Sequence, residues 1–266
     1  MVASTETFAT RLASVIAETG SLLCLGLDPD GMADAAAAER QCHHLLEATL
    51  DKVCAVKANL AFFEQFGSAG YAVLERLRSA VPADRLLILD GKRGDIASTM
   101  TAYARALFDV LGADAVTVNA LLGGDSIAPM LARPGRGVFV LARTSNPGAS
   151  DFLERPAAAG EVALYQRIVE HARGWDAGGG ALGFVVGATA PAAVAEVRRL
   201  APDAPLLLPG VGAQGGALEA AVQVALDADR GGVIVSVSRG IAAAPQGPAA
   251  AARQLRDRIT AARSGG

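Results

Sequence analysis

The feature that most constrains the fold is a series of eight short apolar runs, spaced widely enough for a helix between successive runs. They are Leu22–Leu27, Val53–Val56, Leu86–Leu89, Ala115–Val118, Gly137–Leu141, Gly183–Val186, Leu206–Leu208 and Gly232–Val237. Nearly every position within a run is apolar, which is expected of parallel strands buried on both faces. The pattern predicts an α/β protein, a (β/α)8 TIM barrel formed by a single domain over residues 1–266, with an open doubly wound sheet as the alternative.

Composition argues against several other classes of protein. Hydrophobic residues make up 52% of the chain, yet no uncharged run approaches the roughly twenty apolar residues that a membrane span needs. The net charge of -3, without a basic stripe interleaved with aromatic residues, argues against a nucleic-acid partner. The segment 4–20 predicts an amphipathic helix, because its charges interrupt any signal-peptide core. Three cysteines without C-x-x-C spacing are typical of buried thiols in a reducing compartment, so we expect a cytoplasmic protein.

Polar side chains follow most of the apolar runs at the point where each run ends. In a barrel of parallel strands these positions converge on one mouth, where barrel enzymes have their active sites. The residues at these positions are Asp28, Lys57, Asp90, Lys92, Asp95, Asn119, Thr144, Ser145, Thr189, Gln214, Ser238 and Arg239. The sequence therefore predicts a functional site at this mouth.

The third run leads directly into the densest group of charges. A strand repeats every two residues, so Asp90 and Lys92 are expected on the same side, and Asp95 offers a second carboxylate after the turn at Gly94. Two carboxylates around one ammonium group would keep Lys92 charged, which suits a proton donor to a carbon that becomes negative. Taken alone, the pattern also fits a salt bridge that caps a strand.

A phosphate site is predicted after the last two runs. The segment Pro209–Gly216 lacks bulky side chains, so its backbone N–H groups could approach an anion, although its glycines also fit a tight turn. Arg239 adds a planar two-pronged donor at the end of the eighth run. The long segment Thr144–Gly160 follows the fifth run and is expected to be a loop able to lie over the site.

Six segments of the chain, taken together, resemble the orotidine 5'-phosphate decarboxylase family over nearly the whole sequence. The Lys92–Asp95 and Thr144–Gly148 segments resemble the longer of its sequence subgroups. The six segments are Leu25–Pro29, Val56–Lys57, Asp90–Ile96, Thr144–Gly148, Pro209–Gly216 and Ser238–Ile241.

The resemblance implies decarboxylation of orotidine 5'-phosphate to uridine 5'-phosphate in pyrimidine biosynthesis, without a metal or cofactor. It assigns a charged relay, in which Lys92 protonates C6, to Lys57, Asp90, Lys92 and Asp95. It also implies that Asp28 and Lys57 contact the ribose, that Ser145 contacts the pyrimidine ring, and that Gln214 and Arg239 hold the phosphate. Finally, it implies a homodimer in which Asp95 and Thr99 reach into the partner subunit's site.

Two other interpretations of the sequence remain open. A metal-dependent sugar-phosphate decarboxylase or aldolase-type barrel could share the Asp-x-Lys-x-x-Asp motif and the phosphate site. Such relatives place a metal-binding glutamate after the second strand, where this chain has Lys57. A catalytically silent nucleotide-binding barrel is the non-enzymatic alternative, and the intact set of Asp90, Lys92 and Asp95 argues against it.

Overall fold

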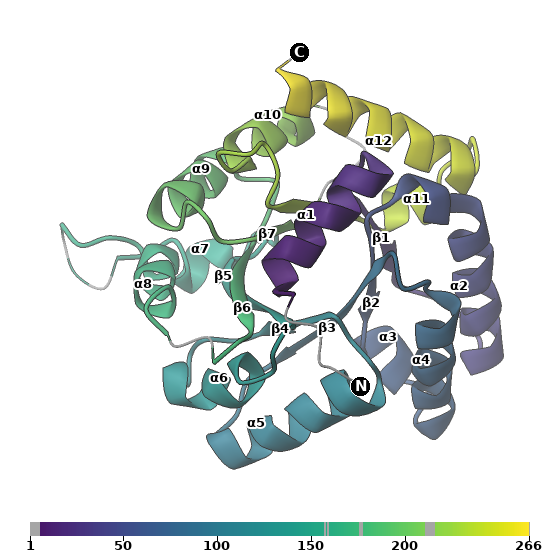
Figure 1. The fold of residues 1–266 in the computed structure, drawn as a ribbon, viewed down its shortest axis with the longest axis horizontal. Helices are drawn as coiled ribbons and strands as arrows, with labels where there is room; N and C mark the ends of the chain where they lie inside the picture. The colour runs from purple at the N-terminus through teal and green to yellow at the C-terminus, as the bar shows by residue number, and fades with distance from the viewer. Residues whose placement is uncertain (1–5, 157, 159, 176–177, 211–215, 266) are drawn as a thin grey trace.

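The computed structural model describes residues 6–156, 158, 160–175, 178–210 and 216–265. Within them, eight parallel strands pair in sequence order and close into a barrel, which helices surround as an outer ring (Figure 1). The strands are β1 Leu23–Leu27, β2 Ala55–Asn59, β3 Leu86–Arg93, β4 Ala115–Val118, β5 Gly137–Arg143, β6 Ala181–Val186, β7 Leu206–Leu208 and β8 Val233–Val237. The closed barrel confirms the predicted fold class and excludes the open sheet.

The helices occupy the stretches between the apolar runs, as their periodicity predicts. They are α1 Phe8–Thr19, α2 Ala35–Thr49, α3 Ala61–Glu64, α4 Ser68–Ala80, α5 Ala97–Ala104, α6 Gly124–Leu131, α7 Ala149–Phe152, α8 Leu164–Ala172, α9 Pro191–Leu200, α10 Gly216–Ala225, α11 Arg239–Ala242 and α12 Pro248–Ser264. A 3-10 turn, η1 Leu50–Lys52, follows α2, and a π-helical turn, η2 Arg105–Val110, follows α5.

The strands β2, β3 and β5 extend further toward their carboxyl ends than their apolar runs, and β2 and β3 carry predicted site residues. β2 continues to Asn59, so Lys57 lies within the strand instead of after it. β3 continues through Asp90 and Lys92 to Arg93. These strands continue past their apolar residues because their backbone groups still pair with neighbouring strands. The predicted ends came from apolar side chains alone, which do not reveal backbone pairing.

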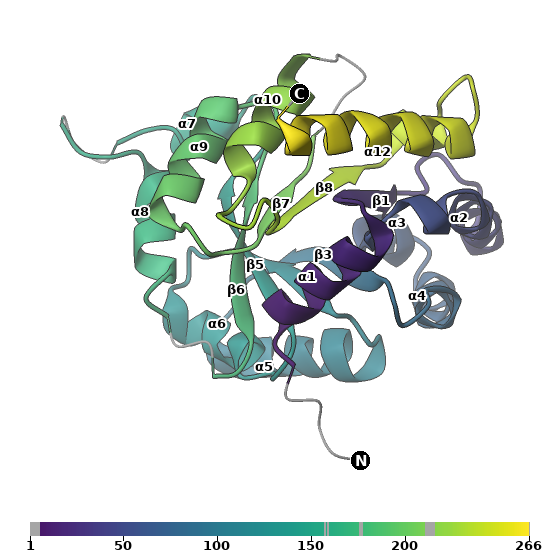
Figure 2. The same ribbon diagram turned by 45° about the horizontal axis from the view of Figure 1, so that its top comes forward.

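Helix α1 closes the N-terminal end of the barrel, as both views show (Figures 1 and 2). Thr7 caps its start by accepting a hydrogen bond from the backbone N–H of Thr10, as N-cap residues do. Its Phe8 ring packs edge-on against Phe139 of β5, with ring centroids 5.9 Å apart. Gly137 makes room for this ring, because a Cβ there would lie 2.8 Å from a Phe8 ring carbon. The amphipathic helix predicted near the N-terminus is thus confirmed.

A buried carboxylate joins α1 to the start of the sheet. Asp114, just before β4, accepts hydrogen bonds from Arg11 of α1 at 2.6 Å and from Arg78 of α4 at 3.1 Å. Arg136, just before β5, donates a third at 3.2 Å, and the backbone N–H of Leu87 a fourth at 2.8 Å. The Asp114 side chain is 4% exposed, so its charge is compensated inside the protein rather than by water.

The three cysteines Cys24, Cys42 and Cys54 are buried and free, as their spacing predicts. Burial raises the pKa of the Cys24 and Cys42 thiols to about 12, so both stay protonated at neutral pH. No helix in the described part of the chain has the length and apolar character required to cross a membrane.

We predict that Asp114→Ala lowers the free energy of unfolding by about 3–5 kcal/mol, because it leaves three guanidinium groups around an empty buried position. Urea denaturation followed by circular dichroism measures this change. Glu161→Ala is the matched control, since it breaks a surface ion pair with Arg167 and should cost less than about 1 kcal/mol. Equal losses in the two variants would contradict a structural role for Asp114.

Candidate active site

The centre of the site is the carboxylate of Asp90, which lies between two ammonium groups. Lys57 Nζ on β2 donates to Asp90 Oδ2 at 3.0 Å, and Lys92 Nζ on β3 donates to Asp90 Oδ1 at 2.7 Å. The side chains of Lys57 and Asp90 are 6% and 11% exposed, whereas that of Lys92 is 46% exposed. The buried pair therefore presents the Lys92 ammonium group to the open mouth of the barrel.

Lys57, Asp90 and Lys92 form a row of charged side chains, called the charged row below. Two further polar side chains extend it. Asp28, directly after β1, places its Oδ1 3.9 Å from Lys57 Nζ. That oxygen is buried and accepts no hydrogen bond among the described residues. On the other side, Thr117 of β4 donates from its Oγ1 to Asp90 Oδ1 at 2.7 Å. The row thus crosses β1 to β4, and Asp28 Oδ1 retains acceptor capacity for a hydroxyl donor.

The pKa shifts of the central pair follow from burial and mutual attraction. Burial alone would raise the Asp90 pKa, but Lys57 and Lys92, with hydrogen bonds from Lys92 and Thr117, hold it well below its ordinary value. Burial alone would lower the Lys57 pKa, but the carboxylates of Asp90 and Asp28 outweigh burial and raise it. Both groups are therefore ionised at neutral pH.

Asp95 and Thr99 lie apart from this row within one chain. Asp95 lies between β3 and α5 and accepts a hydrogen bond from the backbone N–H of Ile96 at 2.7 Å. Across the described ranges, no ion pair joins its carboxylate to Lys57 or Lys92. Within one chain Lys92 therefore pairs with Asp90, and the second carboxylate expected around Lys92 remains a prediction. Thr99, on α5, is partly buried.

Ser145 lies over the carboxyl ends of β6 and β7. A Cβ on Gly187 would approach the Ser145 Cα to 2.7 Å, and a Cβ on Gly210 would approach its Cβ to 2.6 Å. Gly210 also has a φ of 86°, which other residues rarely adopt. Both positions therefore require glycine if the segment after β5 is to rest on its neighbours.

The segment Thr144–Gly160, expected to be a loop, contains helix α7. Arg143 at the end of β5 ties this segment down by donating to Glu154 Oε1 at 2.6 Å and to Thr189 Oγ1 at 3.2 Å. These two contacts link the residues after α7 to the turn after β6. That the segment lies over the site remains a prediction.

The predicted phosphate side of the site is described in part. Gln214 lies outside the described residues, as does most of the glycine-rich turn. Arg239 follows β8, begins α11 and is exposed. The preceding Ser238 lies against β1, where a Cβ on Gly26 would approach the Ser238 Cβ to 2.7 Å. Arg239 therefore follows the carboxyl end of β8 with an exposed side chain, as its place in the sequence predicts.

Thr117 is the site residue that the sequence did not single out. It is 1% exposed and sits within the predicted fourth strand, Ala115–Val118. The available signal was a single hydroxyl in an otherwise apolar strand, since a buried hydroxyl requires a hydrogen-bond partner.

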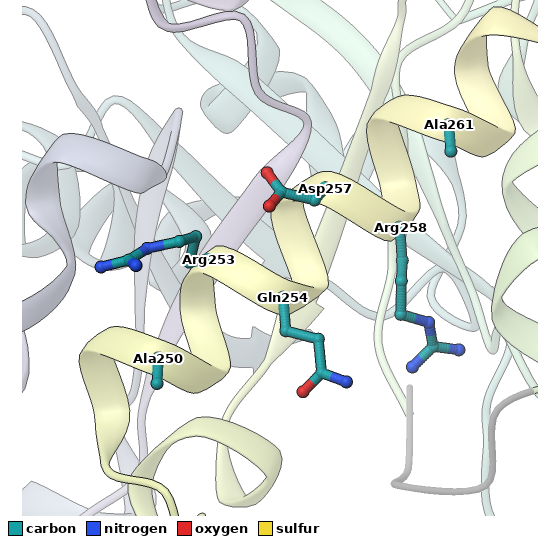
Figure 3. Close-up of a pocket in the computed structure, with 6 residues that line it drawn as sticks. All are labelled: Ala250, Arg253, Gln254, Asp257, Arg258 and Ala261. Carbon is teal, nitrogen blue, oxygen red and sulfur yellow. The ribbon is translucent and has the colours of Figure 1, made fainter.

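A surface hollow of about 490 Å³ lies on α12, away from the charged row. Figure 3 shows that its side chains come from one helix and that Arg253 and Arg258 point in different directions. Its lining consists of Ala250, Arg253, Gln254, Asp257, Arg258 and Ala261. Because these groups do not converge, the hollow does not compete with the charged row as the active site.

Nowhere in the described ranges do three or more His, Cys, Asp or Glu side chains form a group suited to a metal ion.

Comparison with known proteins identifies the family. The model of the Orotidine 5'-phosphate decarboxylase / HUMPS family matches residues 21–255. The chain belongs to this family. The match includes the elements that carry the charged row and Arg239, and it confirms the resemblance that the six segments indicated.

Individual relatives match over nearly their full length. Orotidine 5'-phosphate decarboxylase of Thermomicrobium roseum is 46% identical, over 95% of this chain and 94% of the relative. The protein of the same name from Roseiflexus sp. is 47% identical, over 96% and 98%. The structure of Leishmania donovani OMP decarboxylase superposes with a TM-score of 0.88 at 42% identity, covering 97% of this chain and 99% of that one. The barrel is thus the fold of this family.

We predict a pH-dependent stability difference between the wild type and Asp90→Asn. Because the folded-state pKa of Asp90 lies below its unfolded value of about 4, ionisation of Asp90 stabilises the fold at pH 7. This contribution is lost progressively as pH falls below about 4, because the Asp90 carboxylate of the unfolded chain takes up a proton there while that of the folded protein does not. The difference in unfolding free energy should therefore shrink there, by up to about 1.4 kcal/mol per pH unit.

Urea denaturation between pH 7 and pH 3 measures this difference. The exposed Asp257→Asn is the control, and its difference from the wild type should stay below about 1 kcal/mol at every pH, because it removes only a surface ion pair with Arg256. A constant difference for Asp90→Asn would contradict a depressed Asp90 pKa.

Proposed function

We propose that residues 1–266 form a single-domain barrel enzyme that decarboxylates orotidine 5'-phosphate to uridine 5'-phosphate, a step of pyrimidine biosynthesis. The observation that carries the proposal is the Lys92 ammonium group, which is 46% exposed at the mouth and anchored at 2.7 Å to a buried carboxylate. Family membership and relatives named for this activity at 46–47% identity support it.

The chemistry of this reaction matches what Lys92 can supply. Loss of CO2 breaks the bond from C6 to the carboxylate and leaves an electron pair on C6, with no carbonyl placed to delocalise it. An ammonium group beside that carbon stabilises the developing negative charge and then transfers a proton to it. Lys92 fits this role because Asp90 fixes its position and its side chain remains accessible.

Preorganised positive charge must lower the activation barrier more than repulsion between Asp90 and the substrate carboxylate does. If Asp90 lies about 4 Å from the substrate carboxylate, their repulsion is worth roughly 4 kcal/mol at an effective dielectric constant of 20. Enzymes lower barriers by about 8–23 kcal/mol, so this repulsion supplies at most half. In the structure Asp90 is already paired with two lysines, which weakens its repulsion further. We therefore assign the larger part of the barrier reduction to stabilisation of the C6 carbanion by Lys92. We assign to Lys57 the role of holding Asp90 in place.

The rest of the nucleotide would be bound around the mouth. We assign the ribose to Asp28 and Lys57, because Asp28 Oδ1 is a buried acceptor with no hydrogen-bond donor in the described chain. We assign the pyrimidine ring to Ser145, which lies over β6 and β7, and the phosphate to Arg239 together with Gln214. Binding energy from the phosphate can lower the barrier when it is realised in the transition state.

We further propose that the enzyme is a cytoplasmic homodimer whose sites are shared between subunits. Within one chain Asp95 does not join the charged row, so Asp95 and Thr99 are assigned to the partner subunit's site. The loops around them carry exposed apolar side chains: Ile96 is 63% exposed, Leu121 is 68% exposed and Leu122 is 45% exposed. These loops adjoin, because a Cβ on Gly94 would lie 3.1 Å from the Asn119 Cβ. Such a patch is typical of a surface covered by another protein.

We expect purified protein to convert orotidine 5'-phosphate to uridine 5'-phosphate without added metal, because the lysines supply the positive charge. Loss of substrate absorbance measures turnover, with and without a chelator such as EDTA. Lys92→Ala should reduce kcat by at least about 100-fold, since it removes the proton donor. Activity abolished by the chelator and restored by Mg2+ would favour the metal-dependent alternative, and absence of turnover would favour a silent nucleotide-binding barrel.

Subunit mixing tests the shared sites. Asp95→Ala and Lys92→Ala homodimers should each be nearly inactive. After random exchange at equal concentrations, half of the dimers are mixed, and one of the two sites in each mixed dimer carries neither substitution. Activity should therefore return toward about a quarter of wild type. No recovery, with exchange verified by mass spectrometry, would mean that Asp95 serves its own subunit's site.

A further inference from the structure

Thr117 lies where the pairing between β3 and β4 is interrupted. Leu89 pairs with Val116 and Arg93 pairs with Val118, so the three residues from Asp90 to Lys92 lie opposite Thr117 alone. An interruption of this kind leaves backbone groups of the longer segment without ladder partners. Here the backbone N–H of Lys92 donates to the Thr117 side-chain Oγ1 at 3.0 Å.

The backbone at this interruption is in an unfavourable conformation. Lys92 has a φ of 48°, in the left-handed region that residues other than glycine rarely adopt. Such conformations persist where surrounding contacts determine them, and they cluster at functional sites. The hydrogen bond to Thr117 is one such contact, because it holds the Lys92 amide in place.

The direction of the Thr117 hydrogen bonds is fixed by chemistry. A backbone N–H can only donate, so Thr117 Oγ1 accepts from Lys92 and uses its own proton toward Asp90 Oδ1, 2.7 Å away. The ionised carboxylate can only accept, which agrees with this direction. One hydroxyl therefore orients both the carboxylate that anchors Lys92 and the backbone that carries Lys92.

We propose that Thr117 is a positioning residue for the decarboxylation, acting through Asp90 and Lys92 to aim the Lys92 ammonium group at C6. The proposal rests on the proposed function. Without the hydroxyl, Asp90 loses one of its three side-chain donors and the Lys92 amide loses its partner. The ammonium group then samples other positions, and small displacements of a reacting group slow an enzyme strongly.

The test compares Thr117→Val with Thr117→Ser and with a matched control. Valine keeps the branched shape and removes the hydroxyl, and serine restores it. Thr49→Val is the control, because Thr49 is also fully buried and its hydroxyl bonds a backbone carbonyl, that of Leu45, at 2.7 Å on α2. Measurements are kcat, KM, affinity for uridine 5'-phosphate, thermal unfolding and a crystal structure of each variant.

We expect Thr117→Val to lower kcat by about 10- to 100-fold, which is the effect of losing hydrogen bonds to a charged group. KM and affinity for uridine 5'-phosphate should change far less, because the assigned phosphate, ribose and ring contacts are retained. Thr117→Ser should recover most of the wild-type kcat. Thr49→Val should keep the wild-type kcat even if its unfolding temperature falls as much as that of Thr117→Val.

A kcat for Thr117→Val within about twofold of wild type, or equal losses in the valine and serine variants, would overturn the proposal. The crystal structures separate this outcome from a failure of the proposed function. If wild type does not act on orotidine 5'-phosphate, the proposed function fails, and the positioning role is judged from Lys92 itself. Its φ and its contact with Asp90 should change in Thr117→Val and persist in Thr117→Ser, and unchanged geometry in both would overturn the role.

Discussion

The buried carboxylate of Asp90 is the group on which the rest of the site depends. Placing one charge inside a barrel is costly unless nearby charges and donors compensate it. Lys57 at 3.0 Å, Lys92 at 2.7 Å and the Thr117 hydroxyl at 2.7 Å provide that compensation from three neighbouring strands. The same contacts fix the position of Lys92. The contacts that compensate the charge of Asp90 therefore also aim the proton donor. This double role explains why the buried charge is retained although it is costly.

The two ends of the barrel use ionic groups differently. At the N-terminal end, Asp114 is surrounded by three arginines and a backbone N–H, and α1 covers the opening. These donors converge on one buried acceptor, and the three arginines also bind nearby backbone carbonyls, so the arrangement stabilises the fold. At the other end, Lys92 is 46% exposed and Asp28 Oδ1 retains acceptor capacity. Binding capacity is left at the mouth, as expected where a substrate completes the contacts.

The glycines and the irregular β3 strand belong to the same arrangement. Gly187 and Gly210 let Ser145 rest on β6 and β7, and Gly26 lets Ser238 lie against β1. The interruption between Leu89 and Arg93 moves Lys92 out of the regular ladder, with a φ of 48°. A regular strand would keep the Lys92 amide in the ladder and would not need Thr117. The residue assigned to proton transfer thus lies at one of the irregular points of the barrel.

The sequence alone predicted eight parallel strands, because runs that are apolar at nearly every position are typical of strands covered on both faces. It left a closed barrel and an open doubly wound sheet as alternatives, and the pairing of β1 with β8 decided for the barrel. The sequence also placed Asp28, Lys57, Asp90, Lys92 and Arg239 at one mouth, since the carboxyl ends of parallel strands meet there. Tertiary structure decided which charges pair: Asp90 lies between two lysines, and Asp95 lies apart. It also revealed Thr117, whose role depends on a break in the register between β3 and β4. The periodicity of a single strand cannot encode such a break, because it arises only when two strands pair.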